Sequence, residues 1–200
     1  MTLLDTPKPL LPAVPQPMRW SGAEYDRLVE QGHFDHRRVE LINGEILEMS
    51  PMNEPHAQGI RLVDYALRPA FPPSVATISI QCPMRFGERS RPEPDIAVIA
   101  GTAREVKAHP TTALLVIEVS DSTLAYDREV KAPLYAAEAI AEYWIVNLAD
   151  RCVEVHRRPM PDAASADGFR YGNVRVFTAG ESIAPLAMPD SNISVDDLLP

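Results

Sequence analysis

The sequence PDIAVI occupies residues 94–99, and LLVIEVS occupies residues 114–120. Both runs have the short, aliphatic character of buried β-strands. Each carries one carboxylate, Asp95 or Glu118, and a carboxylate inside a fold is costly unless a cation pairs with it. A divalent cation is a natural partner, because Mg²⁺ and Mn²⁺ prefer oxygen ligands. The two runs therefore predict a sheet core that holds a metal site, which points to phosphodiester chemistry.

The alternation of side chains along a strand gives Glu118 a definite face. It shares that face with Val116 and Ser120, whereas Ile117 and Val119 point to the other side. If the strand that begins at Asp95 lies alongside, the two carboxylates converge on one ion. Such an ion polarises a phosphate and lowers the pKa of a bound water, and a nearby lysine would stabilise the charge that develops.

The segment before these strands carries clear start and turn signals. Ser21 and Glu24 form a capping box, which predicts a helix that stops near Gly32. Further on, Asn43-Gly44 separates two apolar runs, and this dipeptide is the strongest short signal for a β-hairpin. The hairpin places Glu40 on its first strand.

The rest of the chain alternates between helical and strand patterns. His56, Ile60, Val63 and Leu67 recur at helical spacing and predict a helix over residues 54–68. A third helix is expected over residues 127–140, although it contains Pro133. Further strands are expected at residues 76–80, 84–86, 143–147, 151–156 and 174–177, with a polar loop at 158–168. This order predicts a mixed α/β fold, with a central mixed sheet flanked by helices and preceded by a helix and a hairpin.

Composition restricts the class of protein. The chain has 200 residues, which suits one domain, and we expect residues 18–200 to form it after a flexible Pro-rich arm at 1–17. No apolar run approaches the roughly 20 residues of a membrane span, so no membrane partner is expected. The arm does not resemble a signal peptide, and Cys82 and Cys152 form no disulfide or metal pattern. A cytoplasmic protein is the default expectation.

Net charge argues against an extended nucleic-acid-binding surface. The formal charge is -9, whereas binding of a phosphate backbone needs clustered lysine and arginine. A small metal-dependent nuclease remains compatible, because its metal ligands add negative charge. Among the local basic groups, the one from Arg85 to Arg91 precedes the Asp95 strand and is the better candidate for phosphate contact.

Several short motifs occur in a fixed order along the chain. Asp95 after Pro94, followed by Glu118, resembles the PD-(D/E)xK nuclease motif, but Ser120 stands where that motif has its lysine. The whole ordered series resembles the Uma-two family of restriction-endonuclease-like proteins over about residues 20–157. Its members here are ELINGEI at 40–46, PDIAV at 94–98, VIEVS at 116–120, Asp127 with Lys131 and Tyr135, and EYWIV at 142–146.

This resemblance implies a restriction-endonuclease-like core in which the catalytic lysine has moved to the following helix, where Lys131 is the match. It also implies that Asp95 and Glu118 bind Mg²⁺ or Mn²⁺ and that Glu40 joins the acidic cluster. Pro133 departs from a regular helix, because proline removes a backbone hydrogen bond. It either kinks the helix or marks the first turn of a helix that starts near Lys131.

Four further residues have both a structural and a functional interpretation. His56 fits a half-buried core histidine or an acid or phosphate contact at the rim of the site. Tyr135 lies one helical turn after Lys131 and either packs or orients the lysine. Gln81 and Arg85 are possible substrate contacts at the rim.

Three functional hypotheses follow. The leading one is a metal-dependent endonuclease that hydrolyses DNA, with Glu40, Asp95, Glu118 and Lys131 as its catalytic residues. The second is a catalytically inactive nuclease-fold module for binding or assembly, and the third is a metal-dependent hydrolase of small phosphate substrates. A homodimer is also expected, because the apolar hairpin at 143–156 could bury a shared surface.

Overall fold

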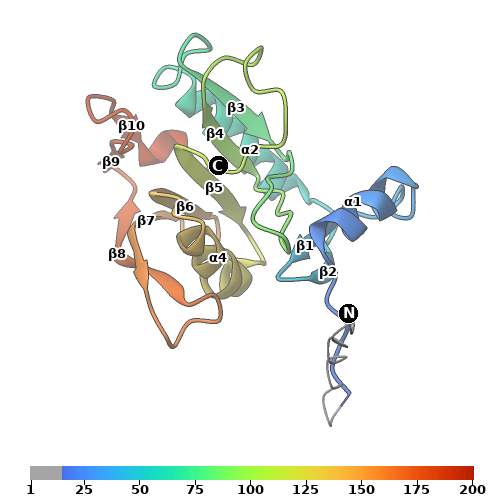
Figure 1. Ribbon diagram of the computed structural model, residues 1–200. Coiled ribbons are helices and arrows are strands. Elements are labelled where there is room, and N and C mark those ends of the chain that lie inside the picture. The colour runs from blue at the N-terminus through green and yellow to red at the C-terminus, as the bar shows by residue number, and fades with distance from the viewer. Residues whose placement is uncertain (1–14) are drawn as a thin grey trace, which may run out of the picture.

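A computed structural model describes residues 15–200, so residues 1–14 of the predicted arm lie outside the described residues. The centre of the fold is a six-stranded sheet in the order β3-β4-β5-β6-β7-β8 (Figure 1). Its strands are β3 Ala76–Ile80, β4 Ile96–Ala100, β5 Leu115–Ser120, β6 Glu142–Asn147, β7 Cys152–Pro161 and β8 Phe169–Thr178. Only the β5–β6 pair is parallel, so the sheet is mixed as the sequence predicts.

The remaining elements surround this sheet. The helical elements are α1 Gly22–Glu30, α2 Glu54–Leu67, α3 Leu124–Tyr126, the π-helical turn η1 Asp127–Lys131, α4 Ala132–Ala137 and the 3₁₀ turn η2 Val195–Asp197. The short strands are β1 Val39–Ile42, β2 Glu45–Glu48, β9 Ser182–Ile183 and β10 Ile193–Ser194. Within residues 15–200, no helix has the length and apolar character needed to cross a bilayer.

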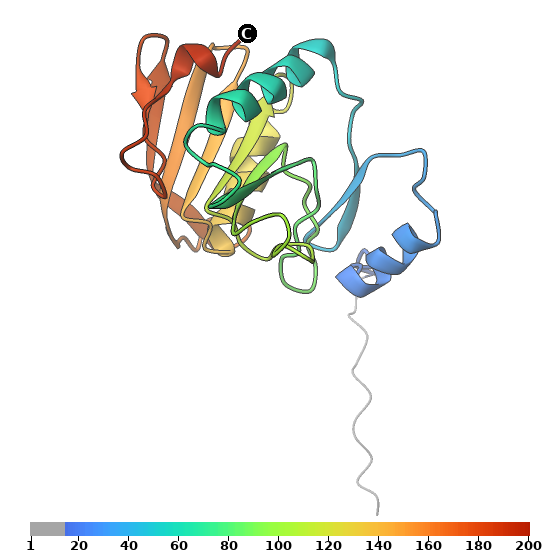
Figure 2. The same ribbon diagram turned by 90° about the horizontal axis from the view of Figure 1, so that it is seen from above.

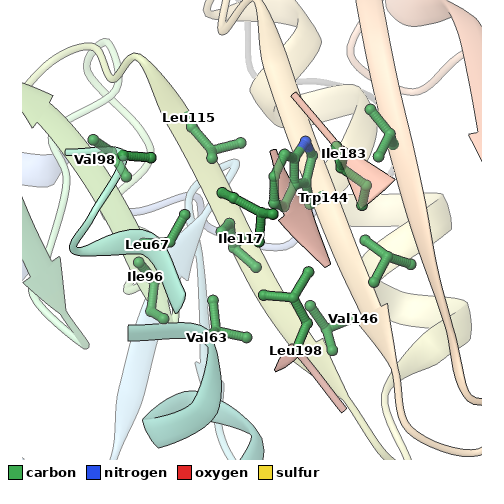
Figure 3. Packing of buried hydrophobic residues seen from close by; sticks show 14 of the residues in the cluster. Val63, Leu67, Ile96, Val98, Leu115, Ile117, Trp144, Val146, Ile183 and Leu198 are labelled. Carbon is green, nitrogen blue, oxygen red and sulfur yellow. The ribbon is translucent and has the colours of Figure 1, made fainter. Parts of the chain in front are cut away.

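Two layers of helices cover the two faces of the sheet. Viewed from above, α2 lies on one face and α4 on the other, while α1 projects to the side (Figure 2). Val63 and Leu67 of α2 pack over Ile96 and Ile117, and the C-terminal Leu198 completes the same cluster (Figure 3). Each such fully buried aliphatic side chain contributes about 1.5–3 kcal/mol of burial free energy.

The opposite face of the sheet packs against α4. Val116 and Tyr143 lie in this second cluster together with Leu134 and Tyr135 of α4. Val116 is therefore on the α4 face, while Ile117 is on the α2 face. The predicted alternation along β5 is confirmed, and Glu118 lies on the α4 face.

The predicted N-terminal cap and hairpin are confirmed. The Ser21 backbone N–H and hydroxyl donate to Glu24 Oε2 at 2.8 and 2.7 Å, which completes the capping box of α1. Asn43 and Gly44 have φ values of 51° and 81°. A type I′ turn requires a positive φ at both central positions, so this dipeptide closes the β1–β2 hairpin as its sequence predicts.

The prediction for residues 84–86 is wrong, because these residues do not form a strand. Phe86 makes only an isolated bridge to Ser90, across a turn in which Gly87 has a φ of 47°. The Arg85 N–H bonds to Pro110 O, in a loop, and not to a neighbouring strand. Met84 and Phe86 are apolar because they are buried in the core. A buried side chain does not require its backbone to pair with a neighbouring strand.

The predicted polar loop at 158–168 is too long. Strand β7 continues to Pro161, where it pairs with Phe169 of β8, so the connection covers residues 162–168. This outer part of β7 pairs with an edge strand. Strands pair there through their backbones, which does not require apolar side chains. The polar sequence therefore gave the wrong position for the end of β7.

The hairpin at 143–156 does not present a shared surface. Residues 143–146 of β6 are fully buried inside the sheet, with one face toward α2 and the other toward α4. A strand covered on both faces has a continuous apolar sequence. The apolar hairpin therefore gives no support to the predicted homodimer.

The helix predicted at 127–140 is interrupted in a specific way. Residues 127–131 form a π-helical turn, in which the Ala132 N–H bonds to Asp127 O. Pro133 follows in the first turn of α4, where its missing N–H is tolerated. Residues 124–137 are helical without a break, so the helix begins at Leu124 and not near Lys131, and it ends at Ala137. The start of a helix near Lys131 is therefore not supported, and the irregular π-helical turn directly precedes Pro133.

Candidate active site

Strands β4 and β5 bring Asp95 and Glu118 together. The strands are antiparallel with Ile96 opposite Ile117, so Asp95 stands opposite Glu118. The Asp95 N–H donates to Glu118 Oε2 at 3.1 Å, and the Val119 N–H donates to Asp95 Oδ2 at 2.9 Å. Each carboxylate thus accepts a backbone hydrogen bond from the other strand, and both are almost fully buried.

Lys131 connects Glu118 to the β1–β2 hairpin. Its Nζ lies 2.7 Å from Glu40 Oε2 and 3.2 Å from Glu118 Oε1, and only 2% of the side chain is exposed. The Tyr135 hydroxyl donates to Glu118 Oε1 at 2.6 Å. The four predicted catalytic residues, Glu40, Asp95, Glu118 and Lys131, therefore form one contiguous cluster.

The rim residues His56 and Gln81 both contact Asp95. His56 Nε2 lies 3.0 Å from Asp95 Oδ1, and the Gln81 amide donates to the same oxygen at 3.2 Å. His56 stands in the first turn of α2, where its N–H bonds to the N-cap side chain of Asn53. Its side chain is 19% exposed and touches the site, so it is more than a core histidine.

Arg85 lies elsewhere in the structure. Its guanidinium is 3.3 Å from Asp26 on α1, and it does not line the cavity at the acidic cluster. Arg91 is buried and bonds to the same Asp26. These two arginines attach α1 to the loop before β4 and do not contact Asp95 or Glu118.

A small cavity of about 70 Å³ opens at the cluster. This volume admits several water molecules. Among residues 15–200, six carboxylates line it, and its only cationic groups are Arg38 and Lys131, with His56 as a third basic side chain. The carboxylates are those of Glu40, Glu93, Asp95, Glu118, Asp121 and Asp127.

The surplus of acids shifts the protonation of the cluster. Burial raises the pKa of Asp127 to about 6, although hydrogen bonds from Thr123 and Ser120 oppose the shift. Burial also raises the pKa of Glu118, and the Lys131 charge only partly offsets it. Two neighbours, Glu118 and Glu40, overcome the burial of Lys131 and raise the pKa of its ammonium group, so Lys131 stays charged.

Asp95 and His56 form a second charge pair. Burial alone would raise the pKa of Asp95, but the His56 hydrogen bond and the Val119 N–H lower it overall. In turn, Asp95 raises the pKa of His56 against the effect of burial. Asp95 is therefore an ionised acceptor, whereas Glu118 in the same cavity holds its proton more tightly.

A divalent cation fits this donor set in charge and in chemistry. Within residues 15–200, no three His, Cys, Asp or Glu side chains lie close enough to enclose an ion by themselves. Mg²⁺ does not require such a cage, because one or two carboxylates commonly hold it, with waters and substrate phosphates as its other ligands. The adjacent carboxylates of Asp95 and Glu118, within a cavity of surplus negative charge, meet that requirement.

Some residues of the cavity were not among the predicted site residues. Arg38, Glu93, Asp121 and Asp127 all line it. Asp127 carried a usable signal, since it lies four residues before Lys131 and so on the same side of a helix. Arg38 and Asp121 had none, because both belong to connections whose path depends on the tertiary fold.

Comparison with known proteins agrees with this arrangement. Residues 23–196 match the model of the Uma2 family, which is described as "Putative restriction endonuclease". The fold is similar to the crystal structure of "a putative nuclease belonging to DUF820" from Anabaena variabilis ATCC 29413. The TM-score is 0.66 at 16% sequence identity, covering 91% of this chain and 97% of that one. No curated protein matches the sequence.

The structural similarity, at this low identity, establishes a restriction-endonuclease-like fold. The family match spans most of the chain, from before the β1–β2 hairpin to the C-terminal turn. The resemblance that the ordered motifs suggested is thereby confirmed, and the chain belongs to the Uma2 family.

Proposed function

We propose that this protein is a metal-dependent endonuclease that hydrolyses phosphodiester bonds in DNA. The observation that carries the proposal is the contact of Lys131 with Glu118, directly across from Asp95, inside an acidic cavity. Two adjacent carboxylates with one lysine are the groups that metal-assisted phosphodiester cleavage needs. Membership of the Uma2 family supports the same reaction class.

Each member of the cluster has a distinct role in this proposal. Asp95 and Glu118 hold Mg²⁺ or Mn²⁺, which supplies Lewis-acid polarisation of the phosphate when bound. Lys131 is charged and therefore acts as an electrostatic stabiliser of the transition state and not as a base. Glu40 holds the Lys131 ammonium at 2.7 Å and so fixes its aim.

A nicking assay on supercoiled plasmid with Mg²⁺ or Mn²⁺ tests the proposal. We expect nicking by the wild type and a loss of at least about 100-fold in Asp95→Asn and in Lys131→Met. Glu129→Gln is the matched control, because Glu129 is exposed on the same π-helical turn and does not line the cavity. Thermal melts of all variants confirm that each is folded.

Metal binding gives an independent result. Calorimetric titration with Mn²⁺ should show binding by the wild type that is lost in the double variant Asp95→Asn, Glu118→Gln. Binding without cleavage of any DNA or RNA would contradict the endonuclease and favour the inactive binding module. Cleavage that survives in Asp95→Asn would remove the proposed site.

The small acidic cavity favours one second candidate, a hydrolase of small phosphate esters. A volume of about 70 Å³ with six carboxylates suits a single phosphate group better than a long polyanion. A panel of mononucleotides, short oligonucleotides and plasmid separates the two. Turnover of mononucleotides alone would establish the second candidate in place of the first.

A further inference from the structure

A second cavity, of about 500 Å³, lies next to β3, which is an edge strand of the central sheet. Its walls are the segment 79–85, which includes the end of β3, and the loop 106–110, which belongs to the β4–β5 connection. The Arg85 N–H donates to Pro110 O at 2.8 Å and ties the two walls together. We call this cavity the basic groove.

The charge of the basic groove is opposite to that of the active-site cavity. Arg85, Lys107 and His109 line it, and no carboxylate of the described part of the chain does. Half of the Arg85 side chain is exposed in spite of its contact with Asp26. Lys107 and His109 are exposed, and neither forms an ion pair with any of the residues that the structure describes. In a chain with a formal charge of -9, two unpaired basic side chains beside the half-exposed Arg85 fit an anionic ligand.

Gln81 links the groove to the acidic cluster. Its N–H bonds to Asp95 O at 3.1 Å, and its side chain donates to Asp95 Oδ1 at 3.2 Å. The next residue, Cys82, already lines the basic groove. Gln81 has a φ of 49°, so the chain changes direction at this residue, directly after β3. The groove thus begins one residue from a group that touches a proposed metal ligand.

We propose that the basic groove binds backbone phosphates of the nucleic-acid strand whose scissile phosphate lies at Asp95 and Glu118. The inference rests on the proposed nuclease function and makes it more specific. A small phosphate ester would fill only the acidic cavity. A strand of several nucleotides reaches both regions, and its phosphates meet Arg85, Lys107 and His109 outside the acidic lining.

Binding of a labelled single-stranded DNA of about 16 nucleotides, measured by anisotropy without divalent metal, tests the groove. Lys107→Gln should weaken binding several-fold and reduce the slope of log affinity against log salt by about one. Arg104→Gln is the matched control, because Arg104 is exposed on the same loop but does not line the groove. It removes the same charge and should leave both quantities within two-fold of the wild type.

Cys82 provides a local readout that does not depend on catalysis. It is exposed in the groove, whereas Cys152 is buried, so iodoacetamide should alkylate Cys82 selectively. Bound DNA should slow this alkylation several-fold in the wild type and in Arg104→Gln, and much less in the double variant Lys107→Gln, His109→Gln. Equal protection in all three proteins, or none in any, overturns the proposal.

These outcomes separate the groove from the nuclease. Nicking that requires Asp95 but is unchanged in the Lys107→Gln, His109→Gln variant, with unchanged DNA affinity, contradicts the groove and leaves the nuclease standing. Protection of Cys82 without nicking supports the groove and contradicts the catalytic proposal. A wild type that binds no DNA at either low or high salt contradicts the groove.

Discussion

The Glu118 carboxylate depends on two side chains that stand one helical turn apart. Lys131 and Tyr135 both contact its Oε1, at 3.2 and 2.6 Å, while its Oε2 accepts the Asp95 N–H. The Tyr135 hydroxyl is fully buried and donates nowhere else among the described residues. It therefore orients a proposed metal ligand, in the way that outer partners of metal sites do.

Tyr135→Phe tests this positioning role. The variant removes one hydrogen bond to Glu118 without opening a cavity, so we expect a loss of roughly 10-fold or more in Mn²⁺ affinity by calorimetry. The cost in stability should be about 0.5–1.5 kcal/mol, because Glu118 Oε1 loses one of its two donors and keeps Lys131. Tyr143→Phe is the control, since its hydroxyl donates to the backbone O of Asp127 and not to Glu118. Equal Mn²⁺ affinities in the two variants would contradict the role of Tyr135.

Glu154 on β7, outside the candidate active site, should make the stability of the fold depend on pH. Burial alone would raise the pKa of Glu154, but hydrogen bonds from His156 and Arg128 lower it from 4.5 to about 2. A carboxyl with a lowered pKa in the folded state stabilises the fold above about pH 4.5. That contribution, at most about 3 kcal/mol, is lost as the pH falls toward 2.

Urea unfolding of the wild type and of Glu154→Gln should therefore give free energies of unfolding that become more similar as the pH is lowered. The difference in free energy of unfolding is expected to be largest near pH 6 and to shrink steadily below pH 4.5. A gap of constant size across this range would show that Glu154 is not held in its ionised form by the fold.

At the scale of the elements, α2 approaches the sheet closely at Gly59. A Cβ on Gly59 would lie 2.7 Å from Val119 Cγ1, so this helix position has room for glycine alone. Val119 also donates its N–H to Asp95, and His56 stands one turn before Gly59 on the same helix. The helix–sheet distance at Gly59 therefore sets the position of His56 against Asp95.

Gly59→Ala should push α2 away from β5. The expected loss is about 1–3 kcal/mol from overpacking, against a gain of about 1 kcal/mol in helix propensity. Gln58→Ala, at the neighbouring exposed position, gains helix propensity without any overpacking, so it should be neutral or stabilising. Thermal unfolding of both variants makes the comparison, and a Gly59→Ala protein more stable than the wild type would contradict the tight contact.

The π-helical turn is the other decisive element. It precedes α4 and holds both Asp127 and Lys131 in the wall of the acidic cavity. π-helical turns are rare and occur frequently at functional sites. The turn thus allows one short segment to supply a buried cation from its last residue and a buried acid from its first.

For the whole molecule, the proposed metal binding would be linked to folding. The acidic cluster joins the hairpin, strands β4 and β5 and the helical segment, so an ion bound there would stabilise the native state only. A divalent ion at 100 times its Kd adds about 2.7 kcal/mol, which corresponds to a rise in Tm of roughly 5–10 °C for a chain of this size. Thermal scans with Mn²⁺ should show this rise in the wild type and not in Asp95→Asn. A similar rise in both would indicate that the ion binds elsewhere.

Local signals in the sequence determined much of the architecture. The capping box of Ser21 and Glu24, the Asn43-Gly44 turn and the alternation along β5 each depend on hydrogen bonds or dihedral angles within a few residues. Such interactions can be read from adjacent positions, and all three are confirmed. The same alternation placed Glu118 on the correct face of the sheet.

The assembled cluster was decided by the tertiary structure. The contact of Lys131 with Glu40 joins residues that are far apart in the chain, and it depends on the β1–β2 hairpin lying next to the π-helical turn. The placement of Gln81 on Asp95, and of Arg85 away from it, depends on how loops pass the sheet edge. Long-range contacts of this kind arise from packing and burial, which act between segments whose spacing the sequence does not encode locally. The sequence by itself therefore determined which residues carry the proposed chemistry, and the fold decided which of them meet.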